Sequence, residues 1–308
     1  MSLSKSLGLL HHLSNQGRQI VSFWRAKLFF QQDSPFITNE TVKKRIDTLS
    51  REKLALPIKG GKNTLWQANT PYIHRNNNIY ELANEAYPIG SLSYSTALEA
   101  LHLTDQRFNK VHLYRPRETV TNILEEKKAL RNNIMPPDTI LENWQINKVP
   151  RNTNIEGPIW ETYSPVPHNI KPEWLFGTVI QEVQGVKVRI TSLERTLIDG
   201  LKNPKYCGGL NEVFKAWVRA LEDIDIKKLV HFTEKYDRSI LYQRVGFVCK
   251  MLRLHHPHFQ KWKANKTPRG GSRLLNPYKE YKREFDSEWN ISINHPVSIL
   301  ESRDADYS

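Results

Sequence analysis

The spacing of apolar residues predicts three helices at the start of the chain. Leu3–Ser14 and Glu40–Lys53 each repeat apolar side chains at intervals of three and four, as one buried helix face requires. Thr38 or Asn39 is expected to cap the later helix, because either side chain can accept a hydrogen bond from a free backbone N–H. Ile20–Phe30 is apolar for most of its length and is interpreted as the helix between them.

A β-hairpin is expected directly after these helices. Leu54–Ile58 and Asn63–Gln67 have the composition of short strands, and Lys59-Gly-Gly-Lys62 between them favours a tight turn. Three helices followed by a hairpin are typical of a winged helix-turn-helix. We expect this module to occupy residues 1–75.

Residues 76–308 predict a larger α+β domain. Ile79–Ala86 is expected to be a helix, and Ser91–Leu103 a strand that leads into a helix. Further strands are expected where branched and aromatic residues stand between polar loops: Val111–Tyr114, Thr139–Val149, Ile159–Tyr163 and Thr178–Val183. The expected parts are a mixed sheet within 76–191, a helical subdomain at 192–254 and a basic tail at 255–308.

Structural signals are densest around residues 187–221. Lys187–Thr191 alternates as a half-buried strand does, and Thr191 stands three residues before Glu194, the spacing of a capping box. Asn203-Pro204 should end the helix that follows, and Gly208-Gly209 allows a sharp turn before a second apolar stripe. The charged residues of the first helix are interpreted as capping and surface-pair residues: Glu194, Arg195 and Asp199.

The same stretch resembles the central motif of the AbiEi family. The resemblance rests on Ser192-Leu-Glu-Arg-Thr-Leu-Ile-Asp199, followed by Asn203-Pro204 and Gly208-Gly209. Members of that family are antitoxins of type IV toxin–antitoxin systems and transcriptional regulators of phage-defence operons. Residues of the motif would then have a structural or an antitoxin role: Ser192, Glu194, Arg195, Asp199, Pro204, Gly208 and Gly209.

The resemblance implies two activities and no enzymatic one. The winged helix would bind inverted repeats in the chain's own promoter. The second domain would neutralise a nucleotidyltransferase-like toxin, without a stable complex between the two proteins. No cofactor is implied.

Charge favours a polyanionic partner. The chain carries a formal net charge of +13, and residues 1–66 hold 11 Lys or Arg against 4 Asp or Glu, about half of that excess. With two cysteines and no apolar run near 18 residues, neither a disulfide framework nor a spanning helix is expected. A signal peptide is not expected either, so a cytoplasmic location is predicted.

The predicted DNA-binding residues lie on the third helix and the wing. Short polar and basic side chains in the first turns of a recognition helix can reach base edges and phosphates in the major groove. Eight residues fit this description: Thr38, Asn39, Thr41, Lys43, Lys44, Arg45, Lys59 and Lys62. A winged helix that contacts only protein is the alternative for this part of the chain.

A metal-dependent, nuclease-like second domain, recruited to nucleic acid by the winged helix, is the alternative enzyme hypothesis. Asp138, Glu161 and Glu182, with Lys187, lie on or near the expected strands and would have to converge on one metal.

Other candidate chemistry is weaker, and no metal site is expected. His255, His256 and His258 lie near Cys249 in sequence but lack the paired spacing of zinc ligands. Cys207 has no adjacent base in sequence that would make it a nucleophile. Arg269-Gly-Gly-Ser272, like Lys59–Lys62, does not complete a phosphate-binding loop.

Overall fold

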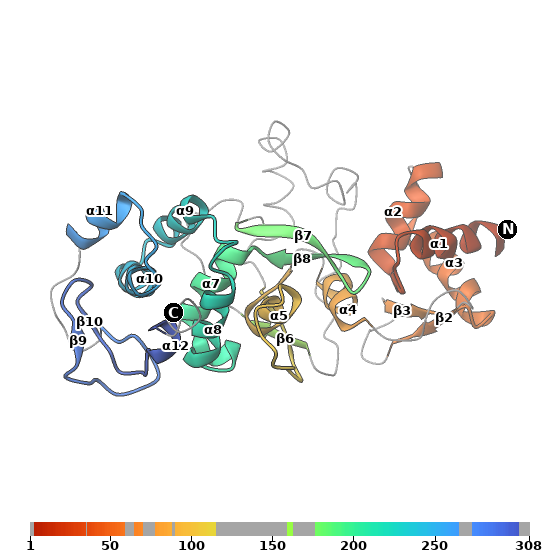
Figure 1. Ribbon diagram of the computed structural model, residues 1–308. Coiled ribbons are helices and arrows are strands. Elements are labelled where there is room, and N and C mark those ends of the chain that lie inside the picture. The colour runs from red at the N-terminus through yellow and green to blue at the C-terminus, as the bar shows by residue number, and fades with distance from the viewer. Residues whose placement is uncertain are drawn as a thin grey trace.

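The computed structural model describes residues 3–34, 36–58, 65–69, 78–87, 90–114, 159–162, 176–264 and 273–301. Its class is α+β with a mixed sheet, as predicted. The elements follow one another along the length of the molecule (Figure 1): an N-terminal helical unit at one end, the larger sheet in the middle and a helical region at the other end.

The N-terminal unit combines three helices with a three-stranded sheet. Its elements are α1 (Leu3–Asn15), β1 (Ile20–Ser22), α2 (Phe23–Asp33), α3 (Asn39–Arg51), β2 (Ala55–Pro57) and β3 (Leu65–Ala68). All pairings are antiparallel, in the order β1-β3-β2. The glycine turn at 59–62 lies outside the described residues. Apolar residues of α1, α2 and α3 pack on Trp66 and Ala68 of β3 to form the core of the unit.

The interpretation of Ile20–Phe30 as one helix is wrong. Ile20 and Val21 pair with Gln67 and Trp66 as a strand, and the helix begins only after Ser22. The Ser22 hydroxyl accepts a hydrogen bond from the Arg25 N–H at 3.3 Å, as an N-cap does. Two β-branched residues before a capping serine therefore form a strand that leads directly into the helix.

The larger sheet has five strands in the order β6-β5-β4-β8-β7. They are β4 (Ser91–Leu92), β5 (Val111–Tyr114), β6 (Ile159–Thr162), β7 (Thr178–Val183) and β8 (Val186–Thr191). β4 is parallel to β8 and β5 to β6, whereas β4–β5 and β7–β8 are antiparallel. The helices α4 (Ile79–Ala86) and α5 (Tyr94–Ala100) pack on it. The strand predicted at Thr139–Val149 lies outside the described residues.

The helical region continues from β8 through the rest of the chain. Its elements are α7 (Leu193–Lys202), the 3-10 turn η2 (Pro204–Cys207), α8 (Leu210–Arg219), α9 (Ile226–Tyr236), α10 (Ser239–Met251), α11 (His258–Ala264), β9 (Phe285–Asp286), β10 (Ile291–Ser292) and α12 (Ser298–Glu301). The described part of the expected basic tail belongs to this core: Trp289 and Ile291 are buried, and a Cβ on Gly246 would lie 2.2 Å from the Trp289 ring.

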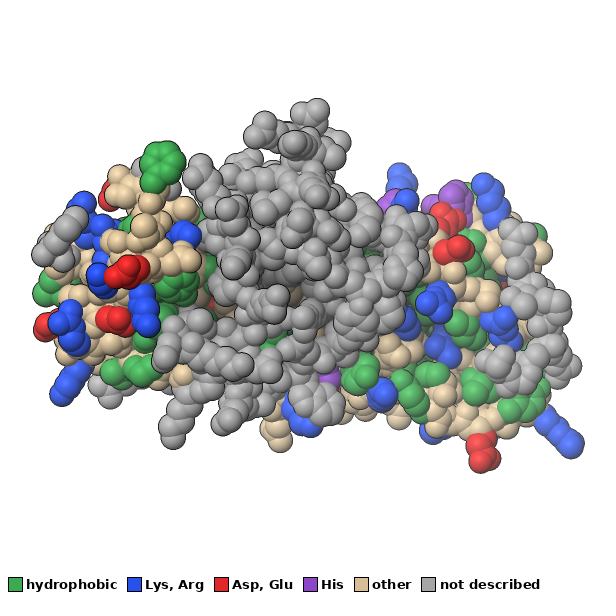
Figure 2. Space-filling model, turned by 180° about the vertical axis from the view of Figure 1, so that it is seen from behind, with side chains coloured by type: hydrophobic (Ala, Val, Ile, Leu, Met, Phe, Trp, Pro, Cys, Tyr) green, Lys and Arg blue, Asp and Glu red, His purple; other side chains and the backbone are tan. Residues whose placement is uncertain are grey.

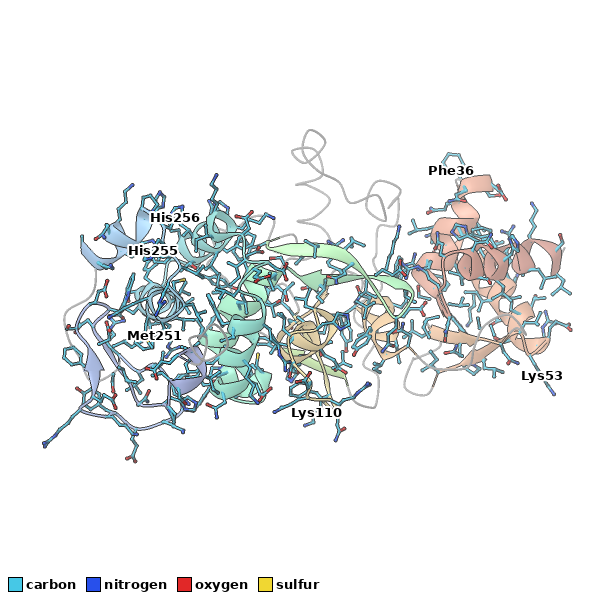
Figure 3. All side chains as sticks on the ribbon, viewed as in Figure 1. Phe36, Lys53, Lys110, Met251, His255 and His256 are labelled. Atoms are coloured by element: carbon cyan, nitrogen blue, oxygen red, sulfur yellow. The ribbon has the colours of Figure 1, made fainter. Side chains whose placement is uncertain are left out.

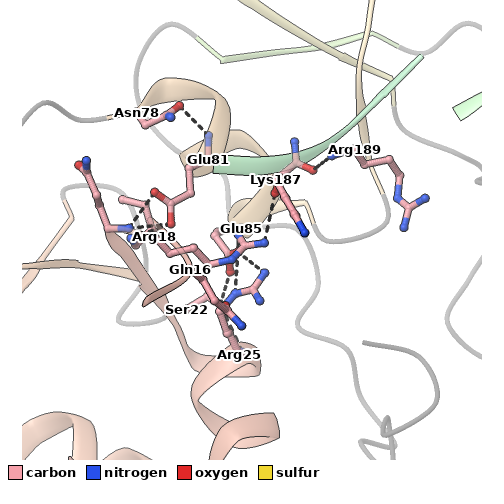
Figure 4. Close-up of polar contacts among 12 residues, drawn as sticks. Gln16, Arg18, Ser22, Arg25, Asn78, Glu81, Glu85, Lys187 and Arg189 are labelled. Carbon is pink, nitrogen blue, oxygen red and sulfur yellow. Dashed lines mark hydrogen bonds and ion pairs between the residues drawn. The ribbon is translucent and has the colours of Figure 1, made fainter. Parts of the chain in front are cut away.

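The N-terminal unit and the larger sheet share a polar junction and part of a core. Ile20 and Leu65 pack in the same cluster as apolar residues of α4 and β8. Figure 4 shows two buried carboxylates of α4, Glu81 and Glu85, that receive hydrogen bonds from the N-terminal unit. The domain boundary predicted near residue 75 falls within residues 70–77, which are not described.

Candidate nucleic-acid interface and the buried motif

Helix α3 buries one face and exposes the opposite one. Val42, Ile46 and Leu49 are fully buried, as their spacing predicts. The helix contains four basic residues against two acidic ones, Glu40 and Asp47. Figure 2 shows Lys and Arg side chains interspersed with Asp and Glu over this end of the molecule. The charge of the exposed surface is therefore mixed, with a basic excess on α3.

The first turn of α3 has a defined hydrogen-bond arrangement. Thr38, and not Asn39, is the N-cap: its hydroxyl accepts from the Thr41 N–H at 3.2 Å and lies 2.9 Å from the Thr41 hydroxyl. The Asn39 Oδ1 accepts from the Lys27 ammonium of α2 at 2.6 Å. Because the Asn39 side-chain oxygen is already hydrogen-bonded, only the NH2 group of this side chain is left to contact a base.

The basic residues of α3 differ in their surroundings. Lys44 forms an exposed i,i+4 ion pair with Glu40 at 2.7 Å, so its charge is partly compensated. The Arg45 guanidinium stacks on Phe30 at 4.5 Å, which fixes it against α2. Lys43 is exposed and has no ion pair within the described part of the chain. Lys59 and Lys62 lie outside the described residues.

Two residues of this surface were not among the predicted contacts. Glu40 projects a carboxylate from the first turn of α3, where it opposes binding of a phosphate group. Phe36 is 93% exposed in the turn before α3. Helical spacing indicates which faces of a helix are buried, but it carries no information on an isolated apolar residue in a turn.

The motif residues Arg195 and Asp199 are buried, so their interpretation as surface-pair residues is wrong. Arg195 Nε donates to Asp199 Oδ2 at 3.3 Å, and its side chain is fully buried. Nη1 donates to the Phe176 carbonyl, and the guanidinium lies 4.3 Å from the Tyr114 ring centre. The Tyr236 hydroxyl donates to Asp199 Oδ1 at 2.5 Å. This network therefore joins α7 to β5 and α9.

The start of α7 is capped one residue later than predicted. Ser192 is the N-cap and accepts from the Arg195 N–H at 3.4 Å. Thr191 bonds instead to Thr196, with their hydroxyl oxygens 2.7 Å apart. Glu194 is buried; its two oxygens accept from the Ser192 hydroxyl and from the Asp225 N–H. Glu194 thus connects the cap to the start of α9.

The end of α7 agrees with the sequence prediction. Asn203 is its C-cap and Pro204 begins η2. Gly208 and Gly209 have φ values of +80° and +104°, which favour glycine over other residues. Cys207 is fully buried, and burial raises the pKa of its thiol. A protonated, inaccessible thiol is a poor nucleophile.

The residues of the nuclease hypothesis are spread over the larger sheet. Glu161 lies on β6 and Glu182 on β7, the two edge strands of the five-stranded sheet. Four strand spacings separate these edges, about 19 Å in a regular sheet. Glu182 lies opposite Lys187 in the β7–β8 register, and Asp138 lies outside the described residues. The strand order therefore gives no support to a common metal site for residues 161 and 182.

The histidines near Cys249 have partners other than a metal. The His258 Nδ1 lies 2.8 Å from Glu234 Oε1, and the Trp262 indole N–H donates to the same oxygen at 3.1 Å. Cys249 is fully buried in α10. No group of three potential metal ligands occurs among the described residues. Within those residues, no helix is long and apolar enough to cross a membrane.

Comparison with known proteins gives a fold and no family. No family model matches the chain, and no curated protein is similar to it in sequence. Its structure is similar to the crystal structure of the RV2827C protein from Mycobacterium tuberculosis, with a TM-score of 0.52 and 10% sequence identity. The alignment covers 96% of this chain and 93% of that one. The similarity is one of fold.

Proposed function

We propose that this chain is a cytoplasmic DNA-binding autorepressor and the antitoxin of a type IV toxin–antitoxin system. Residues 1–75 would act as a winged helix-turn-helix that binds inverted repeats in the chain's own promoter. Residues 76–308 would counteract a nucleotidyltransferase-like toxin.

The order of elements in the N-terminal unit carries the DNA-binding half of the proposal. Helix, strand, two helices and a strand pair, with β1 and β2 flanking β3, are the arrangement expected of a winged helix. In such a module the exposed face of α3 enters the major groove. Thr38, Asn39, Thr41 and Lys43 lie at or near its N-terminal end, where the helix dipole also favours phosphate.

The antitoxin half is supported by the motif resemblance. The resemblance includes Arg195 and Asp199, which join the sheet to the helical region, and the turn at Gly208-Gly209 between η2 and α8. A network of this kind preserves the relative arrangement of α7, β5 and α9. It supports a structural role of the motif more directly than it supports a contact with the toxin.

The deciding experiment is a binding titration of the intact protein. The probes are a duplex of its own upstream region and a scrambled duplex of equal length, each measured across a salt series. We expect tighter binding to the upstream duplex and a steep fall of affinity with salt, because Lys and Arg displace counterions from phosphates.

Two other outcomes would count against the repressor activity. Equal, salt-dependent binding to both duplexes would leave only non-specific attraction to a polyanion. Absence of binding would favour a winged helix that contacts protein. The antitoxin half is tested separately, by co-expression with the proposed nucleotidyltransferase-like toxin and measurement of growth.

A further inference from the structure

We infer that Phe36 is a specificity-determining residue of the proposed DNA interface, and that its ring contacts the C5-methyl group of thymine in the major groove. This inference rests on the proposed function. It adds an apolar contact with a base to the polar and phosphate contacts proposed for α3.

The local backbone holds Phe36 in its exposed position. The Ile37 N–H donates to the Ser34 carbonyl at 2.9 Å, which closes a tight turn between α2 and α3. Ile37 packs against the core of the N-terminal unit, whereas the adjacent Phe36 is 93% exposed. Figure 3 shows Phe36 at the tip of this unit, projecting away from the helices. Phe36 is therefore exposed on a turn that is held in place by a backbone hydrogen bond and by the packing of Ile37.

The position of this turn connects Phe36 to the proposed reading helix. Phe36 precedes the N-cap Thr38 by two residues, so their Cα atoms are at most about 7 Å apart. A recognition helix contacts base edges with its N-terminal end. A residue directly before that end lies at the groove whenever α3 is docked there.

The surroundings of Phe36 favour DNA over an apolar protein partner. The adjoining first turns of α3 present exposed polar and charged residues: Thr38, Asn39, Glu40, which pairs with Lys44, and Lys43. An apolar protein surface that covered Phe36 would also have to desolvate these groups. The major groove offers acceptors and phosphates to the polar residues, and the thymine methyl is its apolar feature.

The test compares thymine with deoxyuridine, which lacks only the methyl group. Wild-type protein, Phe36→Ala and Phe36→Leu are titrated with the upstream duplex and with the same duplex carrying deoxyuridine in place of thymine. We expect wild-type affinity to fall about fourfold per contacted methyl group, as burial of one such group implies. Phe36→Ala should bind both duplexes equally, while Phe36→Leu should keep part of the preference.

Leu7→Ala is the matched control, because Leu7 is an exposed apolar residue, 40% accessible, on α1 and not on the turn. It should keep the wild-type preference for thymine. The urea midpoints of Phe36→Ala and Leu7→Ala should match that of the wild type, since neither side chain is buried.

Three results would overturn the inference. Equal loss of affinity by Phe36→Ala on both duplexes would indicate another role, such as insertion between base pairs. Unchanged binding by Phe36→Ala would remove Phe36 from the interface. Concentration-dependent self-association of DNA-free wild type that Phe36→Ala abolishes, measured by sedimentation equilibrium, would assign the ring to a second copy of the chain. If wild type shows no preference for the upstream duplex, the proposed function itself fails, and that result is distinct from these three.

Discussion

Arg25 of α2 and Glu85 of α4 form a close ion pair across the junction between the N-terminal unit and the larger sheet. Arg25 Nε and Nη2 both donate to Glu85 Oε1, at 2.8 and 2.6 Å, and the Glu85 side chain is fully buried. Arg18 donates to the same oxygen at 3.1 Å, and the Ser22 hydroxyl to Oε2 at 2.5 Å. The Glu85 carboxylate therefore connects α4 to two parts of the N-terminal unit, the turn after α1 and the start of α2.

Glu85→Gln should strongly destabilise the protein. The substitution removes the charge that compensates two largely buried guanidinium groups, and removal of one member of a buried pair costs about 3–5 kcal/mol. Urea unfolding at pH 7 measures the effect. Glu40→Gln is the control: it breaks an exposed pair and should leave the midpoint nearly unchanged. Similar midpoints for the two variants would show that the junction contributes little.

Glu81 should make stability depend on pH. Burial, followed by repulsion from Glu85, raises the pKa of its carboxyl group to about 7. The folded state thus retains a proton that the unfolded state loses near pH 4.5. The free energy of unfolding should fall as pH rises from about 4.5 to 7, by at most about 1.4 kcal/mol per pH unit. Above the folded-state pKa of about 7 the contribution of Glu81 should become constant.

The contribution of Glu81 is isolated by comparing wild type with Glu81→Gln in urea at pH 5, 6, 7 and 8. Glutamine cannot titrate, so the stability of the wild type relative to the variant should decrease between pH 5 and 7 and then stay constant. Parallel stability curves over this range would mean that Glu81 is ionised throughout.

Lys43 and Lys44 should contribute unequally to DNA binding. Lys43→Ala should reduce the slope of log affinity against log salt by about one, as loss of a full phosphate contact does. Lys44→Ala should reduce it by less, because Glu40 already compensates that charge. Glu40→Gln should raise affinity for both specific and scrambled duplexes. Fluorescence anisotropy at several salt concentrations measures the affinity of the three variants. Equal salt slopes for Lys43→Ala and Lys44→Ala would show that the pair with Glu40 does not weaken the contribution of Lys44.

Local sequence patterns predicted most helices well. Ile79–Ala86 begins and ends as predicted, and Asn78 caps its start by accepting from the Tyr80 and Glu81 N–H groups. Ile20–Phe30 was misinterpreted because its strand exists only through pairing with Gln67 and Trp66, more than forty positions away. Apolar character alone does not separate a buried strand from a buried helix.

Local sequence patterns also fail to show whether charged residues of the motif are buried. Arg195 and Asp199 have the i,i+4 spacing of a surface pair, which periodicity cannot distinguish from a buried one. Their burial depends on the Phe176 carbonyl and the Tyr236 hydroxyl, 19 and 37 residues distant from their partners. The start and the buried face of α3 are easier to predict, because its capping threonine and apolar stripe are local.

Asp199→Asn should separate a structural role of the motif from a direct antitoxin role. It leaves Arg195 buried without its counter-charge, so unfolding should require about 3–5 kcal/mol less free energy. If the network is structural, toxin neutralisation should fall only in proportion to the amount of folded protein. Glu222→Gln, at an exposed position after α8, is the control and should change neither quantity. Urea unfolding, soluble-protein quantification and growth rescue are measured on the same set. A variant that remains folded in cells yet rescues no growth would instead assign Asp199 to neutralisation itself.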